Sequence, residues 1–229
     1  MQPAGLRFLD MPLFNGLVRA VGRRDLRPDV LVAYEIGYRE KLFNRLDTNL
    51  NVFWHEYHDL STISPRLGPP GLVCMDLDNR AAASMYGTEW EARYPVTQRL
   101  TLLANHTYQQ PDWRSSAPFT DKEVITPPKH KSMIGVRYDP TDDLHLSSHL
   151  FYVDAATSPS PTNLFLKRKV DPYLRLDLLA EYELWHDTAS VSLGVRNLLD
   201  SNHYEGGTLF LNDAEVPRMI YAEFRISIK

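Results

Sequence analysis

Apolar and polar residues alternate with a period of two along most of this chain. In the segment 173–183 the even positions are apolar and the odd positions are mostly charged, and the segments 188–198 and 217–228 repeat the pattern. Successive side chains of a β-strand point to opposite faces. Each segment is therefore predicted to be a strand with one apolar and one polar face, and helical periodicity is hard to find.

The alternation predicts nine strands, joined by short and long connections in turn. The predicted strands are 30–41, 47–59, 82–94, 98–110, 130–139, 143–154, 172–184, 188–198 and 217–228. The short connections contain Pro, Asp or Asn, which suit tight turns, and lie at 41–46, 95–97, 140–142 and 185–187. The long connections are predicted to be irregular loops and lie at 61–81, 111–129, 155–171 and 199–216.

All short connections fall at one end of the predicted sheet and all long ones at the other. Outer-membrane β-barrels have short periplasmic turns and long extracellular loops, whereas a soluble β-sandwich has no reason to separate them. Aromatic residues precede the short turns at Tyr38, Tyr94, Tyr138 and Trp185, where barrels carry an aromatic girdle. The pattern therefore favours an antiparallel transmembrane β-barrel.

The composition of the chain excludes several classes of protein. The 229 residues carry a net charge of −4, and no apolar run is long enough for a transmembrane helix. The chain has no stripe rich in Lys and Arg, so nucleic acid is not expected as a partner. The single cysteine, Cys74, excludes an internal disulfide and is predicted to be a loop thiol. Residues 1–7 lack the pattern of a signal peptide, so we expect a cytoplasmic protein or a piece of a longer one.

Five short motifs, in order along the chain, resemble the barrel domain of TonB-dependent outer-membrane receptors. They are the Glu35-x-Gly37-x-Arg39 strand, the Tyr57-x-Asp59-Leu60 strand end, the Gly87-x-Glu89-x-Glu91 strand, the Pro128-x-His130 strand entry, and the Asn197-Leu198-x-Asp200 end of a late hairpin. Each motif is weak alone. Five in the family's order, over residues 20–228, make a specific resemblance.

The resemblance implies an all-β fold and a portion of a larger barrel. Receptors of this kind have 22 strands around a plugged lumen, so nine strands correspond to the C-terminal portion. Residues 1–229 would form one barrel portion, with 1–28 as an extracellular loop and 29–228 as the strands. The plug domain and the TonB box, which are N-terminal in the family, have no counterpart here. The family commonly ends in an aromatic residue, whereas this chain ends at Lys229.

The function implied by the resemblance is uptake across the outer membrane of a Gram-negative cell. In this family, loops capture a ferric siderophore or a similar scarce nutrient, and TonB drives a movement of the plug. The expected partners are outer-membrane lipid and lipopolysaccharide, the plug and the remaining strands, the TonB complex and the ferric siderophore. No cofactor is expected. Without plug and TonB box, this portion alone is not expected to transport.

Two sets of candidate site residues follow. The polar strand faces would form the lumen wall that faces the plug, with Glu35, Arg39, Glu89, Glu91, Arg93, Arg175, Asp177 and Arg196. The upper strand ends and the loops would bind the ligand, with Tyr57, His58, Tyr108, Trp113, Arg114, Tyr152, Lys167 and Arg168. The basic residues of the second set would attract an anionic ferric siderophore by long-range electrostatics.

Signatures of catalysis and metal binding are not found. The sequence has no nucleophile elbow, HExxH motif or phosphate-binding loop. His55 and His58 are three apart on a strand and would point to opposite faces. His145 and His149 would share a face at a Cα separation of about 13 Å, too far apart for one metal ion, and His106 and the other histidines are isolated. We expect neither an enzyme nor a metal site.

Two other functions stay open on the sequence. One is a soluble antiparallel β protein that acts as a binding module. The other is a small outer-membrane barrel with an enzymatic or adhesive role. An apolar outer face that continues around the sheet would favour either barrel over the soluble module, and open first and last strands would favour a portion of a larger barrel.

Overall fold

The computed structural model describes residues 10–13, 18–68, 72–115, 126–159, 167–185, 188–201, 203 and 215–227. Within these ranges, the side chains of residues 11–13, 20, 63–65, 115, 158–159 and 167–168 fall outside the description. All elements assigned in this part of the chain are β-strands. None of the residues described forms a helix long and apolar enough to cross a membrane.

Nine long strands follow one another through the described residues. They are β3 (Val30–Leu42), β4 (Leu46–Leu67), β5 (Val73–Pro95), β6 (Leu100–Ser115), β7 (His130–Tyr138), β8 (Leu144–Val153), β11 (Tyr173–Trp185), β12 (Ala189–Arg196) and β13 (Met219–Ile226). Four short strands accompany them. They are β1 (Asp10–Leu13), β2 (Val18–Val21), β9 (Ala156–Pro159) and β10 (Lys167–Val170).

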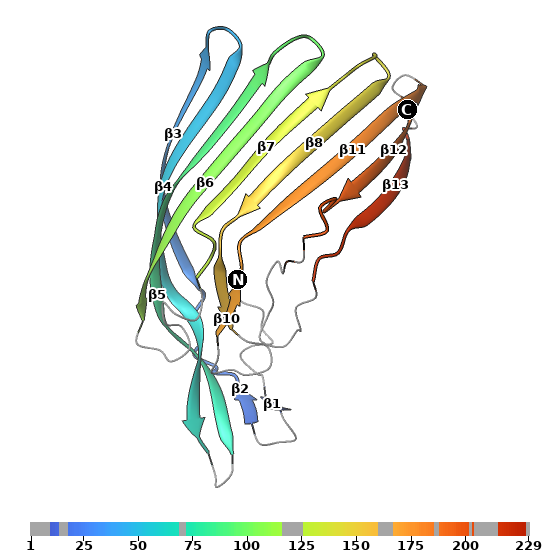
Figure 1. The fold of residues 1–229 in the computed structure, drawn as a ribbon. Helices are drawn as coiled ribbons and strands as arrows, with labels where there is room; N and C mark the ends of the chain where they lie inside the picture. Colours follow the sequence, from blue (N-terminus) through green and yellow to red (C-terminus); the bar gives the residue numbers. More distant parts are fainter. Residues whose placement is uncertain are drawn as a thin grey trace.

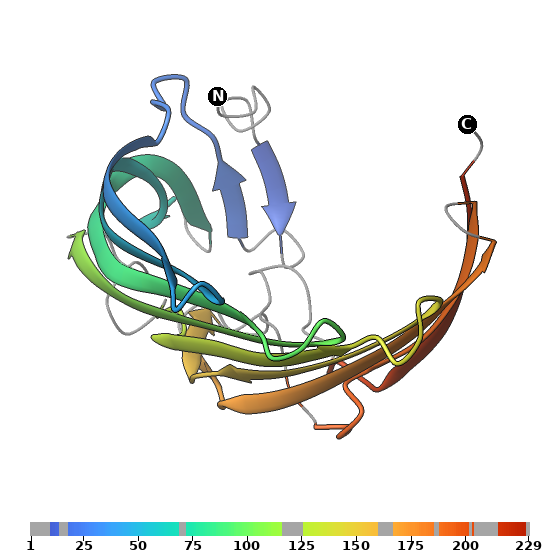
Figure 2. The same cartoon turned by 90° about the horizontal axis from the view of Figure 1, so that it is seen from above.

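The nine long strands form one antiparallel sheet in sequence order. Each long strand pairs with the next, from β3 and β4 through to β12 and β13. The sheet curves into a trough that is open on one side (Figures 1 and 2), and the tight turns lie together at the upper end in Figure 1. The prediction of an all-β antiparallel fold, typical of a barrel portion, is confirmed.

The pairing register separates an apolar face from a polar face. On one face Tyr34 lies opposite Trp54, and Ile36 lies opposite Val52. The residues at the alternate positions form the other face, which is polar, with Gly37 opposite Asn51 and Arg39 opposite Asn49. The alternation seen in the sequence is therefore used throughout the nine strands, and it sorts the apolar side chains to one side of the sheet.

The edge strands of the sheet are β3 and β13. Among the described residues, β3 pairs with β4 alone and β13 with β12 alone. Every residue of β13 is exposed, and so is every residue of β3 except Leu42. Both edge strands run from the long-loop end to the short-turn end, because β3 leads into the turn at 43–45 and β13 follows the long connection after β12.

Most of the described part of the connection 61–81, predicted to be an irregular loop, is β-structure instead. The strand β4 continues to Leu67, the strand β5 already begins at Val73, and they pair from Thr62 opposite Asp78 to Leu67 opposite Val73. We call residues 60–67 and 73–81 the distal hairpin, which projects beyond the other strands at the lower end of Figure 1. Cys74, predicted to be a loop thiol, lies in this hairpin and is only 5% exposed.

Local irregularities explain why alternation does not reveal the distal hairpin. The register shifts between Tyr57 and Leu60 and again between Leu60 and Thr62, and Asp59 has a left-handed φ of 53°. Each shift interchanges the two faces. Further along, Pro65 interrupts the alternation of the sequence. Proline has no N–H to donate, so a strand tolerates it where one side of the strand has no neighbouring strand.

Strands also occupy parts of three other predicted loops. The segment 1–28 contains β1 and β2, which pair with each other, and β2 also pairs in parallel with β5. Figure 2 shows these two strands on the open side of the trough. The predicted loop 155–171 contains the paired strands β9 and β10, and β6 extends into the predicted loop 111–129 as far as Ser115.

Candidate functional site

The eight predicted wall residues lie on one face of the sheet. Partnered residues of an antiparallel sheet share a face, and Asn49 is partnered with both Arg39 and Glu91. In the same way Asn51 is partnered with Glu89. The rows continue across the sheet, so that this polar face carries Glu35, Arg39, Glu89, Glu91, Arg93, Arg175, Asp177 and Arg196.

Exposure indicates that the polar face is the concave one. Side chains converge on the inside of a curved sheet and diverge on the outside, so inner side chains cover one another more. Arg175 on the polar face has a side chain only 14% exposed, whereas Ile134 on the apolar face is 64% exposed. The large apolar side chains therefore point outward, which is the arrangement of a barrel in lipid.

A compact charged cluster sits on this wall around Arg175. The Arg175 Nε lies 3.2 Å from the Asp177 Oδ2, and the guanidinium carbon lies 4.6 Å from the centre of the Phe151 ring. The backbone N–H of Asn197 donates to the Asp177 Oδ1 at 3.0 Å. The wall thus neutralises part of its own charge and ties β11 to the end of β12.

Asn197 organises the start of the connection that follows β12. Its side chain is fully buried and its φ is 55°, a left-handed conformation that Asn tolerates better than most residues. Its Nδ2 donates to the carbonyl oxygens of Ser201 and Val216 at 3.2 and 2.9 Å. The Asn-Leu-x-Asp motif therefore has a structural role, because it closes this loop onto the entry of β13.

An aromatic group on the wall, missed by the sequence reasoning, lies beside Glu35. The His55 Nε2 is 3.1 Å from the Glu35 Oε1, and the His55 ring stacks on Phe53 with centroids 4.8 Å apart. His58 lies opposite Val30 on the other face, as the three-residue spacing predicts. Counting positions from Glu35 across the hairpin would have placed Phe53 and His55 on the wall as well.

Near the short-turn end, His145 lies between two carboxylates. Its Nδ1 is 2.7 Å from Asp139 and its Nε2 is 3.4 Å from Glu183, while the Arg137 Nε is 3.3 Å from Asp139. Burial raises the pKa of the Asp139 carboxyl, but the hydrogen bonds from His145 and Arg137 outweigh it, so that pKa lies below its ordinary value. The carboxylates occupy opposite ring nitrogens and do not converge on one point.

No group of three or more His, Cys, Asp or Glu side chains is arranged to hold a metal ion in the described part of the chain. One pair of histidines nevertheless meets across strands, contrary to the expectation that they are isolated. The His106 Nε2 lies 3.5 Å from the His130 Nδ1, and the His106 Nδ1 lies 2.8 Å from the Ser132 Oγ. The register brings them together, because His130 is opposite Tyr108 and therefore diagonal to His106.

The predicted ligand-binding residues do not form a single cluster. Tyr57 and Trp113 are both partnered with Ala83, so they lie on the polar face. The register places the other strand residues of this set on the apolar face, namely His58, Tyr108, Arg114 and Tyr152. Lys167 and Arg168 lie in β10, and their side chains are among those outside the description. A role of these residues in ligand binding stays a prediction.

Comparison with known proteins decides the family. The family model for the β-barrel of TonB-dependent receptor-like proteins matches residues 10–198. The chain belongs to the TonB-dependent receptor family. This result confirms the resemblance carried by the five motifs, and the family consists of receptors and not of enzymes.

Curated relatives of this receptor chain are outer-membrane proteins of Gram-negative bacteria. The iron-regulated outer membrane virulence protein of Vibrio cholerae is 24% identical over 199 residues, which cover 81% of this chain and 30% of the relative. The ferric-pyoverdine M114 receptor of a Pseudomonas species is 26% identical over 205 residues, covering 83% of this chain and 23% of the relative. The chain thus spans under a third of the length of these relatives. Their location agrees with the predicted location in the outer membrane.

Solved structures show the same fold at low sequence identity. A ferric enterobactin receptor of Pseudomonas aeruginosa gives a TM-score of 0.65 at 18% identity, over 90% of this chain and 32% of the receptor. The ferric-catecholate import receptor Fiu of E. coli gives 0.64 at 16% identity, over 87% and 28%. A copper transporter, OprC, gives 0.66 at 16% identity, over 90% and 32%. The fold of the receptor chain is therefore shared by receptors with different substrates.

Proposed function

We propose that this chain is the C-terminal portion of a receptor that imports a ferric siderophore through the outer membrane in a TonB-dependent manner. The observation that carries the proposal is the family match over residues 10–198 of a sheet whose polar face is concave. Such a face forms part of a lumen wall, and the apolar face meets the lipid.

Iron is the substrate favoured by the relatives. The curated relatives described above are an iron-regulated protein and a ferric-pyoverdine receptor. Two of the structural neighbours are named as receptors for ferric enterobactin and for ferric catecholates. The structural likeness to OprC makes copper the alternative that an experiment has to separate from iron.

The wall residues suit a surface that faces a folded plug. Arg175 and Asp177 pair with each other, whereas Glu35, Glu89, Glu91 and Arg93 are exposed on the concave side. Exposed charges of both signs provide hydrogen-bond partners for a polar domain inside the barrel. In the proposal the plug and the TonB complex act through the parts of the receptor that correspond to the rest of the relatives' length.

The uptake test uses the source bacterium. Deletion of the gene is expected to abolish iron uptake from ferric enterobactin or ferric pyoverdine during iron limitation, and the intact gene on a plasmid is expected to restore it. Copper accumulation, measured in the same cells, serves as the control. Loss of copper accumulation with unchanged iron uptake from a wider panel of ferric siderophores would overturn the siderophore proposal while leaving the family intact.

Two pairs of variants test which face meets the ligand. Trp113→Ala and Tyr57→Ala remove aromatic rings from the polar face, and each is expected to weaken siderophore binding about tenfold, the loss of one good aromatic contact. Tyr152→Ala and Tyr108→Ala remove rings from the apolar face and are expected to leave affinity unchanged. Equal losses in both pairs, measured by fluorescence titration, would contradict the assignment of faces.

A further inference from the structure

The segment that links β2 to β3 crosses the distal hairpin from one side to the other. The strand β2 pairs in parallel with β5, from Val18 opposite Val73 to Val21 opposite Asp76. The strand β3 begins on the far side of the same hairpin, where Val30 lies opposite His58 of β4. We call residues 18–29 the strap.

The side-chain amide of Asn79, and not strand pairing, fastens the strap at Arg27. The Arg27 N–H donates to the Asn79 Oδ1 at 2.8 Å, and the Asn79 Nδ2 donates back to the Arg27 carbonyl oxygen at 3.0 Å. The same Nδ2 donates to the carbonyl oxygen of Asp59 at 2.6 Å. Asn79 therefore pairs with the strap backbone as a neighbouring strand would, and it ties the strap to β4 as well.

Further polar contacts hold the C-terminal end of the strap. The Asp29 Oδ1 accepts hydrogen bonds from both the N–H and the Oγ of Ser61, each at 3.0 Å. The Arg27 guanidinium lies 2.9 Å from the Asp59 carboxylate. Leu26 is the strap's buried apolar residue among those described, so the strap is docked chiefly by hydrogen bonds and ion pairs.

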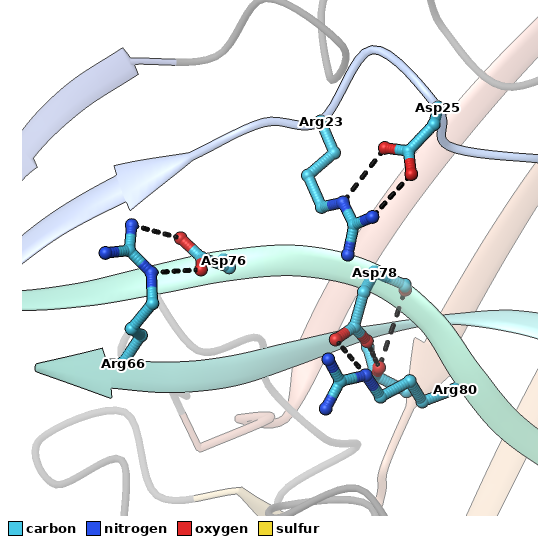
Figure 3. Close-up of polar contacts among 7 residues, drawn as sticks. Arg23, Asp25, Arg66, Asp76, Asp78 and Arg80 are labelled. Carbon is cyan, nitrogen blue, oxygen red and sulfur yellow. Dashed lines mark hydrogen bonds and ion pairs between the residues drawn. The ribbon is translucent and has the colours of Figure 1, made fainter.

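The surface under the strap is charged and incompletely filled. Figure 3 shows Arg23 paired with Asp25 on the strap, close to the pairs Arg66 with Asp76 and Arg80 with Asp78 on the hairpin. A cavity of about 200 Å³ remains between the strap and β5, lined in part by Leu26 and Asn79. A contact of this kind is weaker per unit area than an apolar core, because each polar group regains water when the contact opens.

We propose that the strap is a detachable clamp at the long-loop end of the barrel. In the docked state it joins the entrance of β3 to the distal hairpin, so these elements move as one unit. In the undocked state the hairpin is free to move across the mouth of the trough, while the nine-stranded sheet stays intact. The clamp is a property of this end of the chain and does not depend on which ligand the receptor carries.

The single cysteine of the chain reports whether the strap is docked. Cys74 is 5% exposed and lies opposite Arg19 in the pairing of β2 with β5. Its rate of alkylation by a maleimide, measured on the folded chain in detergent, is expected to rise when β2 leaves β5 together with the rest of the strap. Asn79→Asp keeps the shape of the side chain and one acceptor, but removes both Nδ2 hydrogen bonds. Asp29→Ala removes the contacts to Ser61.

Each variant is expected to raise the alkylation rate roughly 10- to 100-fold, as the loss of about two hydrogen bonds predicts. Asn105→Ala, on the polar face of β6 away from the strap, is the matched control and is expected to leave the rate unchanged. Hydrogen exchange of β6, β7 and β8 is followed in parallel and is expected to stay the same in all variants.

Two results would overturn the clamp. In one, alkylation of Cys74 is as slow in Asn79→Asp and Asp29→Ala as in the parent chain. In the other, alkylation is faster only together with loss of exchange protection in β6–β8, which means that the whole sheet opens. If Asn79→Asp fails to fold, Asp29→Ala and the parent chain in 1 M salt decide the matter, because salt weakens the exposed ion pair of Arg27 with Asp59.

Discussion

Strands β4 and β5 pass through two different environments. Between the turn at 43–45 and Tyr57 they have a neighbouring strand on each side, and their apolar and polar residues are sorted to opposite faces. In the distal hairpin β4 extends beyond β3 and β5 extends beyond β6, and only the short strand β2 pairs alongside β5 from Val73 to Asp76. There the pairs Arg66–Asp76 and Arg80–Asp78 join charged side chains.

The difference shows two ways of stabilising a β-sheet. The main sheet depends on a repeated pattern, in which each residue needs the correct face but few need a particular partner. The distal hairpin depends on individual partners, since Asp78 is only 4% exposed and its carboxylate is matched by Thr62 and Arg80. Three pairs of substitutions sharpen the comparison.

The largest effect is expected from filling a close approach in the main sheet. A Cβ at Gly87 would lie 2.1 Å from the carbonyl oxygen of Tyr108 and 2.5 Å from the Phe53 ring. Gly87→Ala is therefore expected to lower the free energy of unfolding by about 3 kcal/mol, measured by denaturant titration in micelles. Gly37→Ala is the control, because its Cβ would meet nothing closer than Asn51 at 3.7 Å. Equal effects at both sites would contradict the packing described.

A charge on the apolar face is expected to have the next largest effect. Leu193 points outward from β12, and its neighbour Ser192 points to the polar face between Glu181 and Glu223. Leu193→Lys is expected to destabilise the chain in lipid vesicles by about 2 kcal/mol. Ser192→Lys should change stability by less than about 0.5 kcal/mol, since carboxylates lie beside it. The faces would have to be reassigned if the order were reversed.

The smallest effects are expected for removal of an Arg–Asp ion pair, one in the main sheet and one in the distal hairpin. Arg175, whose side chain is 14% exposed, contacts both Asp177 and Phe151, whereas the Arg66 side chain paired with Asp76 is 58% exposed. Arg175→Gln is expected to cost about 1.5 kcal/mol and Arg66→Gln about 0.5 kcal/mol. Urea titrations with and without 1 M salt measure both, and a salt-dependent loss at Arg175 larger than at Arg66 would speak against the comparison.

The main sheet could be predicted from sequence because its pattern is local. In β11, Leu174 and Arg175 already define two faces, and the same parity extends to Asp177 and across the register to Arg196. The same parity places all eight predicted wall residues on one face, and their role as a plug-facing wall stays a prediction. The predicted ligand-binding set follows distance along the strands and not parity, so it joins Tyr57 on one face with Tyr152 on the other.

The distal hairpin and the strap could not be predicted because their contacts are specific and distant in sequence. Asn79 meets the backbone of Arg27, which lies 52 residues earlier. No periodicity in the sequence marks such a contact, because a single side-chain amide makes it and not a row of paired strand residues. Pro65 and the left-handed Asp59 further disguise a region that is nevertheless regular in its pairing.

The direction of the two edge strands sets a parity condition on closure. A barrel in which every neighbour is antiparallel contains an even number of strands, whereas the edges β3 and β13 of this nine-stranded sheet run the same way. An added hairpin of two strands would leave the edges still mismatched. An odd number of added strands makes the two edges compatible with antiparallel closure. The direction of the edge strands therefore limits which sets of strands can complete the barrel, whatever their side chains.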